Sequence, residues 1–309
     1  MASGDLLVIG GAEDKLKKRT VLRDFVERSG GNDARIAVIP TASSLGDEVV
    51  EVYQGVFGKL GAAEVVGVRP ESREDAHDPA MIDLLRRATG IFMTGGNQLK
   101  LSGVIAGTPF ADAIREAHER GVVIAGTSAG ASIQSSHMVA FGTGGATPKQ
   151  RMTQVAAGLG LLSDMVIDQH FDQRNRYGRL LMIVAQSPQL LGMGVDEDTA
   201  ALISTHEDGQ VLRVLGRGAV TIFDPAHIVT DAHEVQRSRP IMASGIQLHV
   251  LTAGHAFHLG RRALLTPADL PEEVAAPRDL RKLVRDIAAA DTSPSALKRR
   301  LARRTKGAN

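Results

Sequence analysis

The sequence of 309 residues lacks cysteine and tryptophan, and it contains only two tyrosines. Without cysteine, a disulfide framework, a thiol nucleophile and a cysteine zinc site are all excluded. The shortage of aromatic side chains argues against the stacking platforms with which proteins bind single-stranded nucleic acid. We therefore expect no nucleic-acid partner and no chemistry that depends on a thiolate.

Strong net charge and long apolar runs are absent as well. The formal net charge is +1, so no overall field attracts nucleic acid or a membrane surface. No segment reaches the ~18 consecutive apolar residues of a membrane-spanning helix. The apolar stretch near the N-terminus is too short for a signal peptide and has no basic segment before it. We expect a soluble cytoplasmic protein with no membrane partner.

The charge is uneven along the chain, which indicates a boundary near the C-terminus. From Arg278 onward the sequence has ten Lys and Arg residues against three Asp residues. The periodicity there predicts basic helices over 279–289 and 294–304. We therefore divide the chain into a main domain over 1–266 and a basic helical tail over 267–309.

Apolar runs alternate with segments of helical periodicity through most of the chain. The predicted strands cover residues 6–9, 35–40, 64–68, 90–94, 122–125, 165–170 and 190–195. The predicted helices cover residues 15–29, 47–60, 79–88, 99–105, 109–119 and 174–186. This alternation indicates an α/β fold with a mostly parallel sheet covered by helices on both faces. Short alternating strands from residue 201 onward predict a smaller antiparallel β extension of the same domain.

The most informative stretch is G-T-S-A-G over 126–130, between a predicted buried strand and a predicted helix. A G-x-S-x-G turn in this context lifts the serine hydroxyl clear of the backbone at the carboxyl end of the strand. Gly126 and Gly130 suit places where strand and helix cross too closely for a side chain. Such a pentapeptide can arise by chance in a glycine-rich loop, but the context favours Ser128 as a nucleophile.

A serine hydroxyl is a weak nucleophile until a neighbouring base takes its proton. Among ten histidines, His170 is the best candidate because it ends an apolar strand and can reach the same edge of the sheet as Ser128. His137 is its rival. We expect His137 to lie on the helix that leaves the serine turn, and therefore to point away from it.

The base needs a carboxylate that holds its tautomer. Glu197 follows the apolar stretch 190–195 and is the candidate, while Asp196 and Asp198 stay open as alternatives. The chain order serine, histidine, acid differs from the order serine, acid, histidine of α/β-hydrolases. An ordinary α/β-hydrolase is therefore disfavoured.

Two backbone N–H groups are candidates for an oxyanion hole. The N–H of Ala129 follows the nucleophile at a helix N-terminus. We expect the second donor in the strand-end loop G-G-N-Q over 95–98, and we choose Gly96 because glycine lets the backbone approach a substrate closely. The alternative for this loop is an ordinary strand-to-helix turn.

Three arginines lie within the six residues 174–179, shortly after the proposed base. At helical spacing Arg176 and Arg179 share a face, and Arg174 lies near them. A run of charges is often a solvated surface, but guanidinium groups beside a base are suited to bidentate binding of a carboxylate. We expect these arginines to recognise a substrate carboxylate.

Together these stretches resemble the cyanophycinases, which belong to a serine peptidase family that also contains aspartyl dipeptidase (peptidase E). The resemblance covers about residues 6–265. The serine turn is common to the family, whereas the D-Q-H-F stretch with its trailing arginines is typical of the cyanophycinases. The matching stretches are I-G-G-A-E-D-K over 9–15, F-M-T-G-G-N-Q over 92–98, G-T-S-A-G-A over 126–131, I-D-Q-H-F over 167–171 with Arg174, Asn175 and Arg176, and G-V-D-E over 194–197.

The resemblance implies a fold like the class I glutamine amidotransferase domain, a triad of Ser128, His170 and Glu197, a homodimer, and no metal or other cofactor. It implies a serine exopeptidase that hydrolyses cyanophycin, a polyaspartate with arginine on its β-carboxyl groups, to β-Asp-Arg dipeptides. The implied substrate contacts are Gln98, Asp168, Gln169, Arg174, Arg176 and Arg179, with Asp168 as an acceptor for guanidinium groups. Two alternatives are a dipeptidase for short Asp-containing peptides and a polymer-binding module without catalysis.

Overall fold

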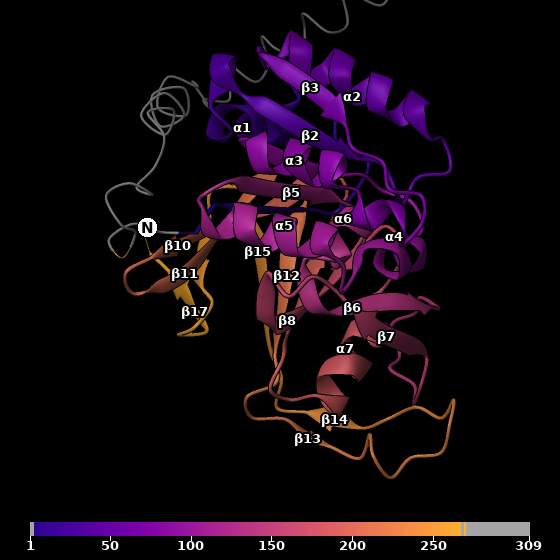
Figure 1. The fold of residues 1–309 in the computed structure, drawn as a ribbon. Coiled ribbons are helices and arrows are strands. Elements are labelled where there is room, and N and C mark those ends of the chain that lie inside the picture. Colours follow the sequence, from indigo (N-terminus) through magenta and orange to yellow (C-terminus); the bar gives the residue numbers. More distant parts are fainter. Residues whose placement is uncertain (1–2, 267–268, 270–309) are drawn as a thin grey trace, which may run out of the picture. The chain divides into compact units, whose positions relative to one another are not determined.

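The computed structural model describes residues 3–266 and 269, and the predicted helices of the basic tail lie outside the described residues. The described residues build two large sheets and one small one (Figure 1). The first large sheet consists, in spatial order, of β17 (Ala263–Leu265), β16 (Ala256–His258), β11 (Gly209–Gly216), β10 (Thr199–His206), β1 (Leu6–Ile9), β5 (Val123–Thr127), β4 (Gly90–Met93), β2 (Arg35–Ile39) and β3 (Glu64–Gly67). The second consists of β15 (Gln247–Thr252), β12 (Ala219–Asp224), β9 (Leu191–Val195), β8 (Leu162–Gln169), β6 (Ser135–Gly142) and β7 (Thr153–Ala157). The small sheet pairs β13 (Val229–Thr230) with β14 (Ala243–Ser244).

The α-helices of the described residues lie mostly between the strands of the first half of the chain. They are α1 (Thr20–Arg28), α2 (Asp47–Lys59), α3 (Pro79–Arg87), α4 (Gln98–Ile105), α5 (Pro109–Glu119), α6 (Ala129–Ser132) and α7 (Tyr177–Gln186). Short 3-10 turns occur at Gly31–Asp33 and Asp75–His77.

The middle of the first sheet is parallel. Strands β1, β5, β4, β2 and β3 pair in this order and run in the same direction. β1, β4 and β5 are buried along their whole length, as expected for strands covered on both faces. β10 and β11 extend the sheet antiparallel beside β1. The predicted α/β class, with a mostly parallel core and an antiparallel extension, is confirmed.

Alternate residues of each strand point to opposite faces of the first sheet, and helices cover both faces. On one face, α1 and α2 pack Phe25, Tyr53 and Phe57 around Phe92 of β4, with ring centroids 4.6–5.5 Å apart. On the other face, α3, α4 and α5 contribute to a larger apolar cluster with residues of β1, β2, β4 and β5. The carboxyl ends of the parallel strands are thereby held on a rigid layer beneath the loops that follow them.

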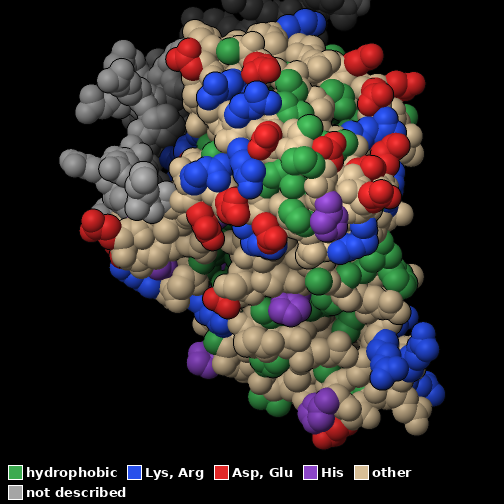
Figure 2. Space-filling model, in the orientation of Figure 1, with side chains coloured by type: hydrophobic (Ala, Val, Ile, Leu, Met, Phe, Trp, Pro, Cys, Tyr) green, Lys and Arg blue, Asp and Glu red, His purple; other side chains and the backbone are tan. Residues whose placement is uncertain are grey.

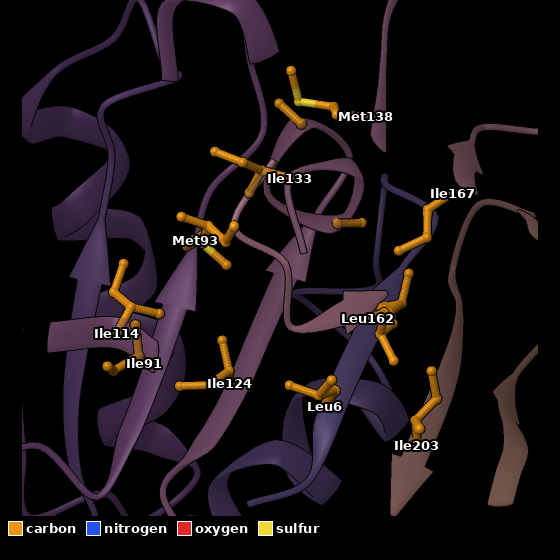
Figure 3. Packing of buried hydrophobic residues seen from close by; sticks show 14 of the residues in the cluster. Leu6, Ile91, Met93, Ile114, Ile124, Ile133, Met138, Leu162, Ile167 and Ile203 are labelled. Carbon is orange, nitrogen blue, oxygen red and sulfur yellow. The ribbon is translucent and has the colours of Figure 1, made fainter. Parts of the chain in front are cut away.

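The second sheet packs against the same large cluster. Leu162 and Ile167 of β8 and Met138 of β6 share this cluster with Leu6 of β1 and Ile124 of β5 (Figure 3). β6, β8 and β9 run parallel, while β7 and β12 are antiparallel to their neighbours. Helix α7 packs on β9 and β12. Because one core joins both sheets, the ends of β8 and β9 are fixed relative to the end of β5.

Two local predictions are wrong. Helix α6 has only four residues, and the chain then enters β6, so His137 lies on a strand rather than on a helix. Helix α1 begins at Thr20 and not at residue 15. The preceding segment wraps around the carboxylate of Asp14, which accepts backbone N–H groups from Leu16, Lys17, Lys18 and Arg19.

Candidate active site

Ser128 occupies a sharp turn between β5 and α6. Its backbone has φ 54° and ψ −109°, a conformation that residues other than glycine rarely adopt. A Cβ on Gly126 would lie 2.0 Å from the carbonyl oxygen of Gly130, and one on Gly130 would lie 2.2 Å from the carbonyl oxygen of Met93. Both glycines therefore allow the close crossing of strand and helix that the sequence predicts.

His170 lies directly after β8 and reaches the serine from the second sheet. Its Nε2 is 3.0 Å from the Oγ of Ser128. Its Nδ1 is 2.6 Å from Oε1 of Glu197, which follows β9. The backbone N–H of His170 donates to the carbonyl of Gly10 at 2.8 Å, so the first sheet also holds this residue. Nucleophile, base and acid thus form one hydrogen-bonded chain across the ends of three strands.

The structure distinguishes Glu197 from its two acidic neighbours. The carboxylate of Asp196 accepts the backbone N–H groups of Asp172 and Ala219, at 3.1 and 3.0 Å. The carboxylate of Asp198 accepts the N–H of Asp14 at 2.8 Å. Both flanking aspartates therefore brace the loop, and Glu197 is the acid that contacts the imidazole.

The pKa of His170 lies below the ordinary value for histidine. Burial is the largest cause, and the positive charges of Arg174 and Arg176 act in the same direction. The hydrogen bond and the negative charge of Glu197 oppose these effects by favouring imidazolium. His170 is consequently neutral at pH 7, which is the state that can accept a proton from Ser128.

The loop after β4 lies directly against the nucleophile. A Cβ on Gly95 would be 3.2 Å from the Cβ of Ser128, so the loop passes close beside the serine side chain. Gly96 has φ 145°, and a Cβ there would lie 2.0 Å from the carbonyl oxygen of Ala42. Ala129 is the first residue of α6. The two predicted donors, Gly96 and Ala129, are thus on the segments that flank Ser128.

The predicted guanidinium acceptor, Asp168, is fully buried and already bound by two of the chain's own arginines. Nε of Arg179 donates to Oδ2 of Asp168 at 2.5 Å, and the same guanidinium also donates to Oδ1. Arg176 donates to Oδ1 at 3.1 Å and to the side chain of Gln169 at 2.8 Å. Burial lowers the pKa of Arg176 to about 10. These four side chains form a buried ion network, and their direct contact with a substrate stays a prediction.

The other two predicted substrate contacts are more accessible. Arg174 is exposed, and its backbone N–H donates to the carbonyl of His170 at 3.1 Å. Gln98 is half-buried at the start of α4, and its Nε2 donates to the carbonyl of Val139 on β6 at 2.9 Å. Gln98 therefore connects the loop beside Ser128 to the second sheet.

Sequence reasoning missed two residues that hold this site. Gly11 has φ 106°, and a Cβ there would lie 2.3 Å from Cε1 of His170. The side-chain oxygen of Gln173 accepts the backbone N–H of Glu197 at 2.9 Å. Both lie in stretches that the sequence singles out, but the contacts themselves join residues far apart in the chain.

Within residues 3–266 and 269, no group of three or more His, Cys, Asp or Glu side chains could hold a metal ion. In the same part of the chain, no helix is long and apolar enough to cross a membrane.

An α/β fold with a serine on a strand-to-helix turn, hydrogen-bonded to a histidine and through it to a glutamate, defines a serine-type hydrolase. The model of peptidase family S51 matches residues 6–211. The chain therefore belongs to this family and is a serine peptidase.

The chain is similar to proteins known as cyanophycinases. It is 41% identical over 262 residues to the cyanophycinase of Trichormus variabilis, which covers 84% of this chain and 87% of that protein. It is 41% identical over 258 residues to the cyanophycinase of Synechococcus elongatus, covering 83% of this chain and 79% of that protein. The cyanophycinase of Geminocystis herdmanii is 38% identical over 255 residues, covering 82% and 93%.

A crystal structure of a peptidase from an acI-B1 actinobacterium superposes with a TM-score of 0.61. The match covers 84% of this chain and 98% of that chain at 21% identity. The two proteins share the fold.

Proposed function

We propose that this chain hydrolyses cyanophycin and releases β-Asp-Arg dipeptides, acting as an exopeptidase. The observation that carries the proposal is the hydrogen-bonded chain Ser128–His170–Glu197 in a protein about 41% identical to cyanophycinases over most of its length. The proposed chemistry requires no metal ion or organic cofactor, because these three side chains supply the nucleophile, the base and the acid.

Acylation begins when Oγ of Ser128 attacks the scissile carbonyl while Nε2 of His170, 3.0 Å away, takes the hydroxyl proton. Glu197 holds the Nδ1 proton and stabilises the imidazolium that forms. The N–H groups of Gly96 and Ala129 donate to the oxyanion of the tetrahedral intermediate. His170 then gives its proton to the departing amine, which leaves an acyl group on Ser128. Water, activated by His170, releases the acid and restores the serine.

Arg174 is the group best placed to bind a substrate carboxylate. It is exposed, it lies four residues after the base, and its charge acts on His170. A released β-Asp-Arg dipeptide carries free α-carboxylates that suit a guanidinium fork. Gln98, whose Nε2 is bonded to the carbonyl of Val139, contacts the same substrate through its side-chain oxygen. The buried network of Asp168, Arg176 and Arg179 gives this segment its shape.

The remaining parts of the proposal concern surroundings and assembly. The protein acts in the cytoplasm as a homodimer. Figure 2 shows positive and negative side chains interspersed on the upper part of the face in view. No nucleic acid or membrane takes part.

Incubation with insoluble cyanophycin tests the function. Wild type should clear the suspension and release β-Asp-Arg, identified by mass, and Ser128→Ala should do neither. Equal clearing by Ser128→Ala would contradict the mechanism. Turnover of an α-Asp dipeptide without turnover of the polymer would identify an aspartyl dipeptidase instead. Polymer binding without covalent labelling of Ser128 by a serine-reactive phosphonate would identify a binding module.

A further inference from the structure

The end of β1 and the loop that follows it are bonded to Ser128, to His170 and to the residue after Glu197. They carry the I-G-G-A-E-D-K stretch over 9–15, to which the proposed mechanism assigns no role. Three consecutive carbonyl groups each accept one backbone hydrogen bond: Ile9 from the N–H of Ser128 (3.0 Å), Gly10 from that of His170 (2.8 Å) and Gly11 from that of Asp198, the neighbour of Glu197 (2.9 Å). Movement of this loop would therefore displace nucleophile, base and acid relative to one another.

One charged side chain of this loop turns inward. Glu13 is 4% exposed, although a carboxylate is rarely buried without partners. Its Oε2 accepts the hydroxyl proton of Thr127 at 2.6 Å. Its Oε1 accepts from the ammonium group of Lys15 at 2.7 Å and from the hydroxyl of Tyr53, on α2, at 2.5 Å. Three donors converge on one buried carboxylate.

The protonation states of this cluster agree with its geometry. Burial raises the pKa of Glu13, but the Lys15 ammonium and the hydrogen bonds that Glu13 accepts outweigh burial, so the pKa lies below its ordinary value. Burial and the negative charge of Glu13 raise the pKa of Tyr53 well above its ordinary value. At neutral pH Glu13 is therefore ionised and Tyr53 is a donor.

Thr127 joins this cluster to the nucleophile. It is the last residue of β5, it is buried, and Ser128 follows it in a strained conformation. Strained backbone persists only where the surroundings hold it. The bond from Glu13 to Thr127 fixes the residue at which β5 turns, and it is short and charge-assisted.

We infer that Glu13 is a positioning residue for catalysis. Through the hydroxyl of Thr127 it holds the turn that aims Oγ of Ser128 at Nε2 of His170. Glu13 touches no reacting atom, and it acts on reactivity by fixing the nucleophile from behind. This inference depends on Ser128 as the nucleophile and not on the identity of the polymer.

The chain offers a matched control for the loss of a buried carboxylate. Asp224, the last residue of β12, is 3% exposed and pairs with Arg262 at 2.6 Å. The side chains of Lys15 and Arg262 are equally exposed, at 29%. Asp224→Asn therefore removes a similar ion pair that has no bond to the triad segments.

The experiment measures the rate at which a serine-reactive phosphonate labels Ser128, together with the thermal midpoint of each variant. Glu13→Gln and Thr127→Val should each label about tenfold or more slowly, as expected for a misplaced nucleophile. The double variant should be no slower than the slower single variant, because both changes remove one coupling. Thr127→Ser, which keeps the hydroxyl, should label within about twofold of wild type. Asp224→Asn should lower the midpoint as Glu13→Gln does and leave the labelling rate unchanged.

Wild-type labelling rates in Glu13→Gln or Thr127→Val would overturn the inference. It would also be overturned if the double variant labelled more slowly by the product of the two single factors. Equal slowing by Asp224→Asn would also overturn it, by showing a general effect of lost stability. Thr127→Val leaves all charges in place, so the test stands even if Glu13→Gln does not fold. A wild type that labels at Ser128 but leaves cyanophycin intact would contradict the proposed function alone.

Discussion

The imidazole of His170 fills the space in which a side chain on Gly11 would lie. An added Cβ at Gly11 would be 2.3 Å from Cε1 and 2.4 Å from Nε2 of the ring, the nitrogen that faces Ser128. The imidazole can therefore keep its position and its distance to the nucleophile only if residue 11 is glycine.

Gly11→Ala should displace the imidazole and lower kcat/KM by about 100-fold, since misplacement by about 1 Å has this effect on a reacting group. Gly254→Ala is the control, because Gly254 also has a positive φ (89°) but nothing lies within 4 Å of its added Cβ. Both variants bear the cost of a strained backbone, and Gly254→Ala should keep full activity. Equal kinetics in the two variants would show that the ring contact is unimportant.

Arg174→Gln should raise the pKa of His170, because a nearby positive charge that disfavours imidazolium is removed. The base works only when neutral, so the acid limb of the pH–rate profile should move to higher pH. We would measure this with phosphonate labelling of Ser128, which avoids effects on substrate binding. Arg86→Gln removes an exposed arginine that pairs with Asp83, and its profile should not move. A shift to lower pH in Arg174→Gln would contradict the assignment.

The strained backbone of Ser128 predicts that two inactive variants differ in stability. Ser128→Gly should relieve the conformation at φ 54°, while Ser128→Ala keeps the strain. Ser128→Gly should therefore be more stable than Ser128→Ala by about 1–2 kcal/mol. Urea denaturation of both variants would measure the difference. Equal free energies of unfolding would mean that the turn carries no strain.

Asp168→Ala should destabilise the fold strongly, because it leaves Arg176 and Arg179 without their buried carboxylate. Removal of one partner from a buried ion pair costs about 3–5 kcal/mol. Asp83→Ala breaks an exposed pair with Arg86 and should cost under about 1 kcal/mol. Chemical denaturation of both variants compares them. If Asp168→Ala lowers the free energy of unfolding no more than Asp83→Ala does, the role of Asp168 is in substrate binding rather than in stability.

The strand ends that carry the site could be predicted from the sequence, because each apolar run that forms a strand is followed by polar residues. Ser128, His170 and Glu197 each follow such a run and each lies at a strand end in the structure. The same pattern could not tell which sheet a strand joins. β8 and β9 read like the strands of the first sheet, and only hydrogen bonds between distant residues assign them to the second.

The hydrogen-bond partners of individual side chains were the second feature that the sequence could not predict. The helical period from residue 15 is real, but the carboxylate of Asp14 captures four N–H groups and delays the helix to Thr20. Likewise, the three arginines that follow His170 suggest free guanidinium groups, whereas in the structure Arg176 and Arg179 are buried and bonded to Asp168. In both places a nearby carboxylate satisfied donors that the pattern had left available.

The nucleophile belongs to one sheet, and the base and the acid belong to the other. The catalytic hydrogen bond therefore spans a seam between two separately hydrogen-bonded layers, joined by a shared apolar core. Sliding of one layer against the other changes the Oγ–Nε2 separation directly, while every strand keeps its own ladder. The Oγ–Nε2 distance of 3.0 Å therefore depends on the shared core and on the backbone bond from His170 to Gly10, and not on the hydrogen bonds within either sheet.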